Sequence, residues 1–212
     1  MKKILTTVAV ACAALAIPYT ASAQFSIPSF GGSKSSAPAA DLSGQQTTLV
    51  KNFVAANVDV LKANAKMSEA LGLKATAADA EAVAQQLSSG STFDKDSASK
   101  AATAVGDSGG AIAAKLAEKP QLDAAAKVTY TQGLLSLAKG AVRYKGLGQD
   151  VTSMGDGLKS APLTQLPSLG GATYVVSQFP TSTTEVIKAL KNAVDFAKSN
   201  GIEVPKEATS LL

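Results

Sequence analysis

The chain has 212 residues, a formal net charge of +4 and a single cysteine, and it contains neither histidine nor tryptophan. It therefore lacks the usual ligands of zinc, copper, haem and iron–sulfur sites and the commonest general base. Its mild charge argues against nucleic acid as a partner. We expect no metal site, no cofactor and no catalytic residue, and so a protein that is not an enzyme.

The first 23 residues have the features of a Sec signal peptide. A basic start is followed by an apolar run over 4–17 and by the A-x-A cleavage signal Ala21-Ser22-Ala23. The run is too short for a membrane anchor. Cys12 raises the alternative of a lipoprotein, but the leucine usual three residues before such a cysteine is absent. We predict cleavage after Ala23 and a periplasmic protein, with full secretion as the alternative.

A mature chain that begins at Gln24 has the length of one domain and carries no cysteine, so its stability must come from a hydrophobic core. Its formal charge is +2, the +4 of the whole chain less Lys2 and Lys3. We predict a flexible Gly/Ser/Pro linker over 24–40, a helical bundle domain over 41–201 and a C-terminal tail over 202–212.

Asp41 is placed to cap a helix that runs to about Leu71. Apolar residues recur in it at alternating steps of four and three, which is typical of a helix that packs in a bundle. This seam consists of Leu49, Phe53, Ala56, Val60, Ala63, Met67 and Ala70. Asn57 and Asn64 lie beside the seam. They either bond to another helix and set its register or, as is commoner, lie at the wet edge of the core.

A second helix is predicted from the capping box Thr76-Ala77-Ala78-Asp79 to Gly90, and a third from Asp94 or Asp96 through 106–110, Gly-Asp-Ser-Gly-Gly. The apolar stripe of the third helix consists of Ala98, Ala101, Val105, Gly109, Ile112 and Leu116. Gly109 lies on this stripe and Ser108 lies off it. Each helical glycine is unfavourable by about 1 kcal/mol relative to alanine. We therefore predict a notch or kink over 106–110, with a neighbouring helix packed close to Gly109.

Pro120 fits the first turn of a fourth helix. Gly133 and Gly140, seven residues apart, would let another helix approach closely. The glycines between 146 and 157 are expected to fray or bend the helix. Its predicted apolar stripe consists of Ala124, Val128, Thr131, Leu135, Ala138 and Val142.

Pro162 and Pro167 interrupt the chain after this helix. An apolar helix or extended segment then ends before Pro180, and the capping box over 182–185 begins a final helix that Asn200-Gly201 closes. No convincing strand alternation occurs. We predict an all-α fold, an up-and-down bundle of about five or six antiparallel helices with a disordered N-terminal tether.

Two short motifs suggest catalysis, and both lack the residues that the mechanism needs. The five letters over 106–110 match those around the nucleophile of chymotrypsin-like serine proteases, but that mechanism requires a histidine. Ser97-Ala98-Ser99-Lys100 matches the S-x-x-K of penicillin-binding proteins, but the S-D-N and K-T-G motifs are absent. Both motifs are more simply interpreted as helix surface or helix packing.

A basic cluster is formed by Lys139, Arg143 and Lys145 together with Tyr144. Such a cluster either contacts an acidic lipid headgroup or partner or, more commonly, is the solvated face of a helix.

The segment 160–184 contains no charged residue. It forms a buried helix with its loops, or lines an apolar ligand cavity with Tyr174 and Gln178 as its polar groups, or enters a membrane, for which its composition is poor.

The function expected from these patterns is that of an exported, non-enzymatic helical bundle with a protein-interaction or structural role in the cell envelope. The alternative is a periplasmic carrier that binds a small apolar ligand or lipid in the bundle core. A membrane-active bundle is a third option. The expected partner is thus an envelope protein or an apolar small molecule, and membrane contact is not favoured.

Overall fold

A computed structural model describes residues 41–212, so the predictions for the signal peptide and the linker lie outside the described residues. The long helices are α1 (Leu42–Ala70), α2 (Lys74–Ser89), α3 (Lys95–Ala117), α4 (Ala124–Ser160) and α5 (Gly170–Ser199). A short 3₁₀ helix, η1 (Leu166–Leu169), precedes α5, and the short α6 (Lys206–Thr209) follows it. No strand occurs within 41–212, which confirms the predicted all-α bundle.

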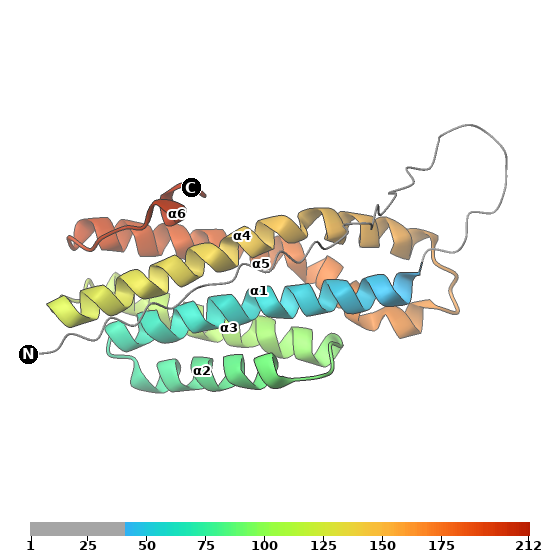
Figure 1. The fold of residues 1–212 in the computed structure, drawn as a ribbon, viewed down its shortest axis with the longest axis horizontal. Helices are drawn as coiled ribbons and strands as arrows, with labels where there is room; N and C mark the ends of the chain where they lie inside the picture. The colour runs from blue at the N-terminus through green and yellow to red at the C-terminus, as the bar shows by residue number, and fades with distance from the viewer. Residues whose placement is uncertain (1–40) are drawn as a thin grey trace, which may run out of the picture. The chain divides into compact units, whose positions relative to one another are not determined.

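Successive long helices run in alternate directions, and α1 lies in the middle of the bundle (Figure 1). The contacts explain this position, since α1 packs against each of the other four long helices. The Asp41 side chain accepts a hydrogen bond from the Gly44 amide at 3.0 Å and so begins α1 as predicted. Every residue of the predicted seam between Leu49 and Ala70 is buried, because a central helix must be covered on more than one face.

The buried face of α4 differs from the predicted stripe. Val128 and Val142 are 61% and 53% exposed, so they lie outside the core. Of the predicted stripe, Ala138 is buried. The face that packs inward also carries larger side chains, which are Tyr130, Leu134, Leu137, Tyr144, Leu147, Val151 and Met154. The predicted stripe contains mostly valine, alanine and threonine, with Leu135 as its one leucine. The tyrosines and leucines bury far more apolar surface, and they decide which face turns inward.

Two glycines of α4 allow this helix to approach α1 closely, as predicted. A Cβ atom at Gly133 would lie 2.6 Å from Met67 Cγ and 3.1 Å from the Met67 backbone nitrogen. A Cβ atom at Gly140 would lie 2.7 Å from Val60 Cγ2. Both contacts are closer than a real Cβ tolerates. Because glycine has no side chain at these two positions, α4 can pack closer to α1.

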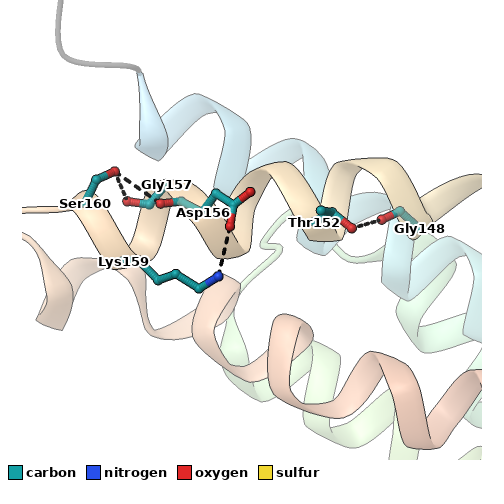
Figure 2. A network of polar contacts seen from close by, with 6 residues as sticks. All are labelled: Gly148, Thr152, Asp156, Gly157, Lys159 and Ser160. Carbon is teal, nitrogen blue, oxygen red and sulfur yellow. Dashed lines mark hydrogen bonds and ion pairs between the residues drawn. The ribbon is translucent and has the colours of Figure 1, made fainter.

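The glycine-rich half of α4 does not fray, which was one of the two predicted outcomes, since the helix continues to Ser160. Its hydroxyl groups bond to backbone carbonyls one turn earlier (Figure 2): Thr152 Oγ1 donates to Gly148 O at 2.9 Å, and Ser160 Oγ donates to Asp156 O at 3.1 Å. Lys159 also pairs with Asp156 at 2.9 Å. These contacts are exposed and individually weak. We attribute the continuity of the helix mainly to the buried residues of its inward face.

Helix α5 continues through Pro180, where the sequence predicted a break and a new capping box. Proline removes one backbone hydrogen bond from a helix, but buried side chains anchor both halves here: Val175 before Pro180, and Val186 and Leu190 after it. Thr184, predicted as part of the capping box, instead donates to the Pro180 carbonyl at 2.9 Å from inside the helix. Burial of side chains on both sides of Pro180 therefore outweighs the local tendency of the chain to end the helix there.

The ends of α2, α3 and α4 agree with the sequence prediction in part. The carboxylate of Asp94 caps α3 in a full capping box with Ser97, and Gly90 ends α2 as expected. The predicted box at Thr76 is wrong, because α2 begins at Lys74 without a side-chain cap. Pro120 lies before α4, whose cap is Asp123.

The residues that follow α5 pack back on the bundle. Gly201 adopts a positive φ of 62°, which ends the helix, and Ile202 and Ala208 are buried. No helix within 41–212 combines the length and the apolar character needed to cross a membrane.

Candidate functional site

The Gly-Asp-Ser-Gly-Gly motif lies inside the uninterrupted helix α3, and its serine points inward rather than off the apolar stripe as predicted. Ser108 is 5% exposed. Its hydroxyl donates to the Ala104 carbonyl at 2.6 Å and accepts from Asn64 Nδ2 of α1 at 2.8 Å. The serine can take a core position because both of its hydrogen-bonding roles are filled there. It packs as a polar link between two helices, and within 41–212 its hydroxyl bonds only to the Asn64 amide and to the backbone carbonyls of Ala104 and Val105.

Asn57 makes the second buried polar link, this time between α1 and α4. Its Oδ1 accepts from the Tyr144 hydroxyl at 2.8 Å, and its Nδ2 donates to the Phe53 carbonyl at 2.8 Å. Both Asn57 and Asn64 are almost fully buried, at 0% and 2% exposure. Of the two predictions for these asparagines, the cross-helix bond is therefore the one that the structure adopts.

The glycines of the motif have no close packing partner, which corrects the prediction for Gly109. A Cβ at Gly109 would meet only Asn64 Nδ2, at 4.0 Å, and a Cβ at Gly106 or Gly110 would meet nothing within 4 Å. Glycine at Gly133 and Gly140 is explained by close approach to α1. At Gly106, Gly109 and Gly110, by contrast, the absence of a side chain leaves open space.

That space is a surface groove between α3 and α5. A hollow of about 240 Å³ lies over the glycines, and a second of about 540 Å³ continues it, sharing Ala113 and Asn192 with the first. We call the two together the α3–α5 groove. Its α3 wall includes the small residues Gly106, Gly110, Ala113 and Ala117 beside the larger Val105 and Leu116. Its α5 wall includes Glu185, Lys188, Asn192 and Asp195, and its floor includes Val60 and Asn64 of α1.

The groove combines small residues with a few polar groups. The four small residues of the α3 wall are all exposed and follow steps of four, three and four, so they form one straight stripe on the helix. At the floor, the residue Asn64 is 2% exposed, and its Oδ1 accepts no hydrogen bond from any residue of 41–212. The groove therefore offers space, a stripe of small residues and one acceptor at its floor.

The predicted basic cluster is not a single site. Tyr144 turns into the core, where its ring packs edge-on against Phe53 at 5.9 Å between centroids, and burial raises the pKa of its hydroxyl. Arg143 pairs with Asp59 of α1 at 2.6 Å. Lys139 and Lys145 remain exposed on either side of the helix.

Tyr174 and Gln178 are not brought together as polar groups of one cavity. Tyr174 borders an open hollow of about 750 Å³ beside the α4–α5 connection, whose lining includes Leu163 and Leu166 but not Gln178. Within the uncharged segment, Leu169, Ala172 and Val175 are buried, while Leu163 is 83% exposed. The segment is thus partly core helix and partly exposed connection.

The serine and lysine of the S-x-x-K match also have structural roles. Ser97 Oγ accepts from the Asp94 amide at 2.9 Å in the cap of α3, and Lys100 donates to the Gln86 side chain of α2. Across 41–212, no group of three or more histidine, cysteine, aspartate or glutamate residues is arranged to hold a metal ion.

Sequence reasoning missed the α5 wall of the groove because it placed a helix boundary over 182–185. The exposed stripe from Gly106 to Ala117 was visible in the sequence. Spacing within α3 does not show whether another helix covers this stripe, so the sequence does not identify it as a surface. Comparisons of the chain with protein family models, with curated proteins and with solved structures find no match.

Proposed function

We propose that the chain is an exported, non-enzymatic helical bundle of the cell envelope that binds another polypeptide along the α3–α5 groove. The observation that carries the proposal is the pair of open glycines, Gly106 and Gly110. Together they disfavour α3 by about 2 kcal/mol relative to alanine, and no contact within the bundle uses the space that they leave. A polypeptide that packs against α3 would fill that space.

The shape of the groove favours a polypeptide over a small molecule. Pockets that enclose drug-sized ligands have volumes of about 300–1,000 Å³ and cover most of the ligand. The two hollows of the groove are about 240 and 540 Å³, and both lie open at the surface, so neither encloses a ligand in this way. The stripe from Gly106 to Ala117 covers 12 residues of helix, and its two ends are about 16 Å apart along the axis. A groove of this kind suits the apolar face of a helix better than a compact ligand.

Site-specific photo-crosslinking in cells tests the proposal. A crosslinking side chain replaces Asn192, which borders both hollows, and a control crosslinker replaces the exposed Ala82 on α2. We expect a protein adduct from position 192 and none from position 82. The adduct should disappear in a groove-blocked variant, Gly106→Leu with Gly110→Leu, in which the new side chains extend into open space.

The outcome that contradicts the proposal is also defined. An adduct at position 192 that the groove-blocked variant leaves unchanged would exclude the groove as the binding surface, and no adduct at all would exclude a polypeptide there. Native mass spectrometry of the mildly extracted protein covers the carrier alternative. A small apolar molecule that co-purifies, and is lost in the groove-blocked variant, would establish a carrier in place of a protein-binding bundle.

A further inference from the structure

A second unpartnered feature lies on the outer face of α4. Val128 and Val142 are 61% and 53% exposed, and the partly exposed Leu135 lies midway between them. The three residues are seven apart, so they share one face of the helix. That face is opposite the side that carries Tyr130, Leu137 and the other core residues. We call Val128, Leu135 and Val142 the α4 seam.

The α4 seam and the α3–α5 groove have matching spacing and opposite shape. Along the groove, Gly106 and Ala113 are seven residues apart, and so are Gly110 and Ala117. Helices pack most closely where large side chains of one enter spaces left by small residues of the other. The seam presents large apolar side chains at the repeat at which the groove presents small ones.

A lysine lies beside the α4 seam, and the groove carries one acid without an ion-pair partner in 41–212. Lys139 lies between Leu135 and Val142 on nearly the same side of α4, and it is exposed. The wall of the groove is mixed in charge: Glu185 and Lys188 are both exposed, and neither forms an ion pair with any residue of 41–212. At the floor, Asn64 Oδ1 accepts no hydrogen bond from these residues. A helix that brings a lysine beside its apolar residues would supply the donor that these acceptors lack.

We propose that a second copy of this chain occupies the groove, with the α4 seam of one copy packed into the α3–α5 groove of the next. The inference rests on the proposed function and names its partner. No residue of α4 lines the groove, so a chain cannot fill its own groove with its own seam. Since seam and groove are different surfaces, the contact is head-to-tail, and each added copy leaves one seam and one groove free. Open assemblies that grow with concentration follow, as suits a structural role.

The test uses two variants of the purified chain, each lacking one side of the contact. Val128→Asp with Val142→Asp removes the seam at exposed positions, and Gly106→Leu with Gly110→Leu blocks the groove at positions open to solvent. Sedimentation velocity over a range of concentrations should show association of the unchanged chain. Each variant alone should associate about tenfold more weakly or not at all.

Mixing the two variants provides the decisive measurement. The seam variant keeps an intact groove, and the groove variant keeps an intact seam, so the mixture should form one-to-one dimers and nothing larger. A matched control is Leu163→Asp, which changes an apolar residue that is 83% exposed but lies outside both surfaces, and it should associate like the unchanged chain. Circular dichroism and urea unfolding verify that each variant is folded.

Three results would overturn the inference: an unchanged chain that stays monomeric at every concentration, a variant that associates alone as strongly as the unchanged chain, or a mixture that forms no dimer. These results are distinguishable from failure of the proposed function. A monomeric chain that still gives a groove-dependent adduct from position 192 in cells binds a different polypeptide, so only the inference fails. A monomeric chain without an adduct contradicts both.

Discussion

Replacing the open glycines of α3 with alanine should stabilise this protein, although both belong to a motif that looks catalytic. Gly106→Ala and Gly110→Ala each add a methyl group where nothing lies within 4 Å. The added group therefore causes no clash. Each change removes the conformational freedom that glycine gives the unfolded chain, and each should raise the free energy of unfolding by about 0.8–1.0 kcal/mol. The double variant should gain about 2 kcal/mol if the two effects add.

A matched substitution on α4 should have the opposite sign. At Gly133 the new Cβ would lie 2.6 Å from Met67 Cγ, 3.1 Å from the Met67 nitrogen and 3.2 Å from the Ala63 carbonyl oxygen. The Met67 side chain can move, but the two backbone atoms can move only if the helices separate. Overpacking of this kind is unfavourable by about 1–3 kcal/mol, against a gain of about 1 kcal/mol in helix propensity. Gly133→Ala should therefore lower the stability by up to about 2 kcal/mol.

Urea and thermal unfolding, followed by circular dichroism at the helical signal, measure both effects. For a domain of this size, 1 kcal/mol corresponds to about 2–4 °C in the unfolding midpoint. The Gly106→Ala, Gly110→Ala variant should therefore unfold about 4–8 °C higher, and Gly133→Ala should unfold lower. A double variant with an unchanged or lower midpoint would refute the reasoning, because it would show that the glycines of α3 are packed within the bundle after all.

Two further predictions concern the buried polar groups. Ser108→Ala removes the acceptor of Asn64 Nδ2 at 2.8 Å and leaves that group only the Val105 carbonyl at 3.5 Å. Urea unfolding should therefore show a free energy of unfolding lower by about 1–3 kcal/mol. A variant as stable as the original would mean that the bond between α1 and α3 contributes nothing. Burial raises the pKa of the Tyr130 and Tyr144 hydroxyls, so above about pH 10 the unfolded chain loses these protons before the folded chain does. The stabilising effect of the neutral hydroxyls is complete below that pH and is lost as the pH rises, by at most about 1.4 kcal/mol per pH unit for each tyrosine. Urea midpoints between about pH 9 and pH 11 should fall less steeply in Tyr130→Phe and Tyr144→Phe than in the original, since lysine titration is common to all three; equal slopes would contradict the assignment.

The buried hydrogen bonds that join α1 to α3 and α4 could be predicted from the sequence only in part. Asn57 and Asn64 are seven residues apart beside an apolar seam, which indicates that they share a face. Whether such a face is wet or buried depends on what packs against it. Here Tyr144 and Ser108 supply partners from helices far away in the chain, and both asparagines become core residues.

The stripe of small residues on α3 can be predicted from the sequence, but its place beside α5 cannot. The stripe from Gly106 to Ala117 can be recognised on α3 from its spacing alone. Its pairing with Glu185 and Asn192 requires α5 to pass unbroken through Pro180 and to lie beside α3. Local signals at Pro180 favour a break, and only the burial of side chains on both sides of it outweighs them.

Spacing within single helices is enough to predict the helical class, the start of α1 at Asp41, the apolar seam of α1 and the close approach at Gly133 and Gly140. Packing between helices sets two further features: α4 turns its tyrosines inward and Val128 and Val142 outward, and the glycines of α3 remain uncovered. The physical reason is that a helix with two apolar faces has two ways to pack. The choice between them depends on the total surface buried by all the helices together, which no single segment specifies.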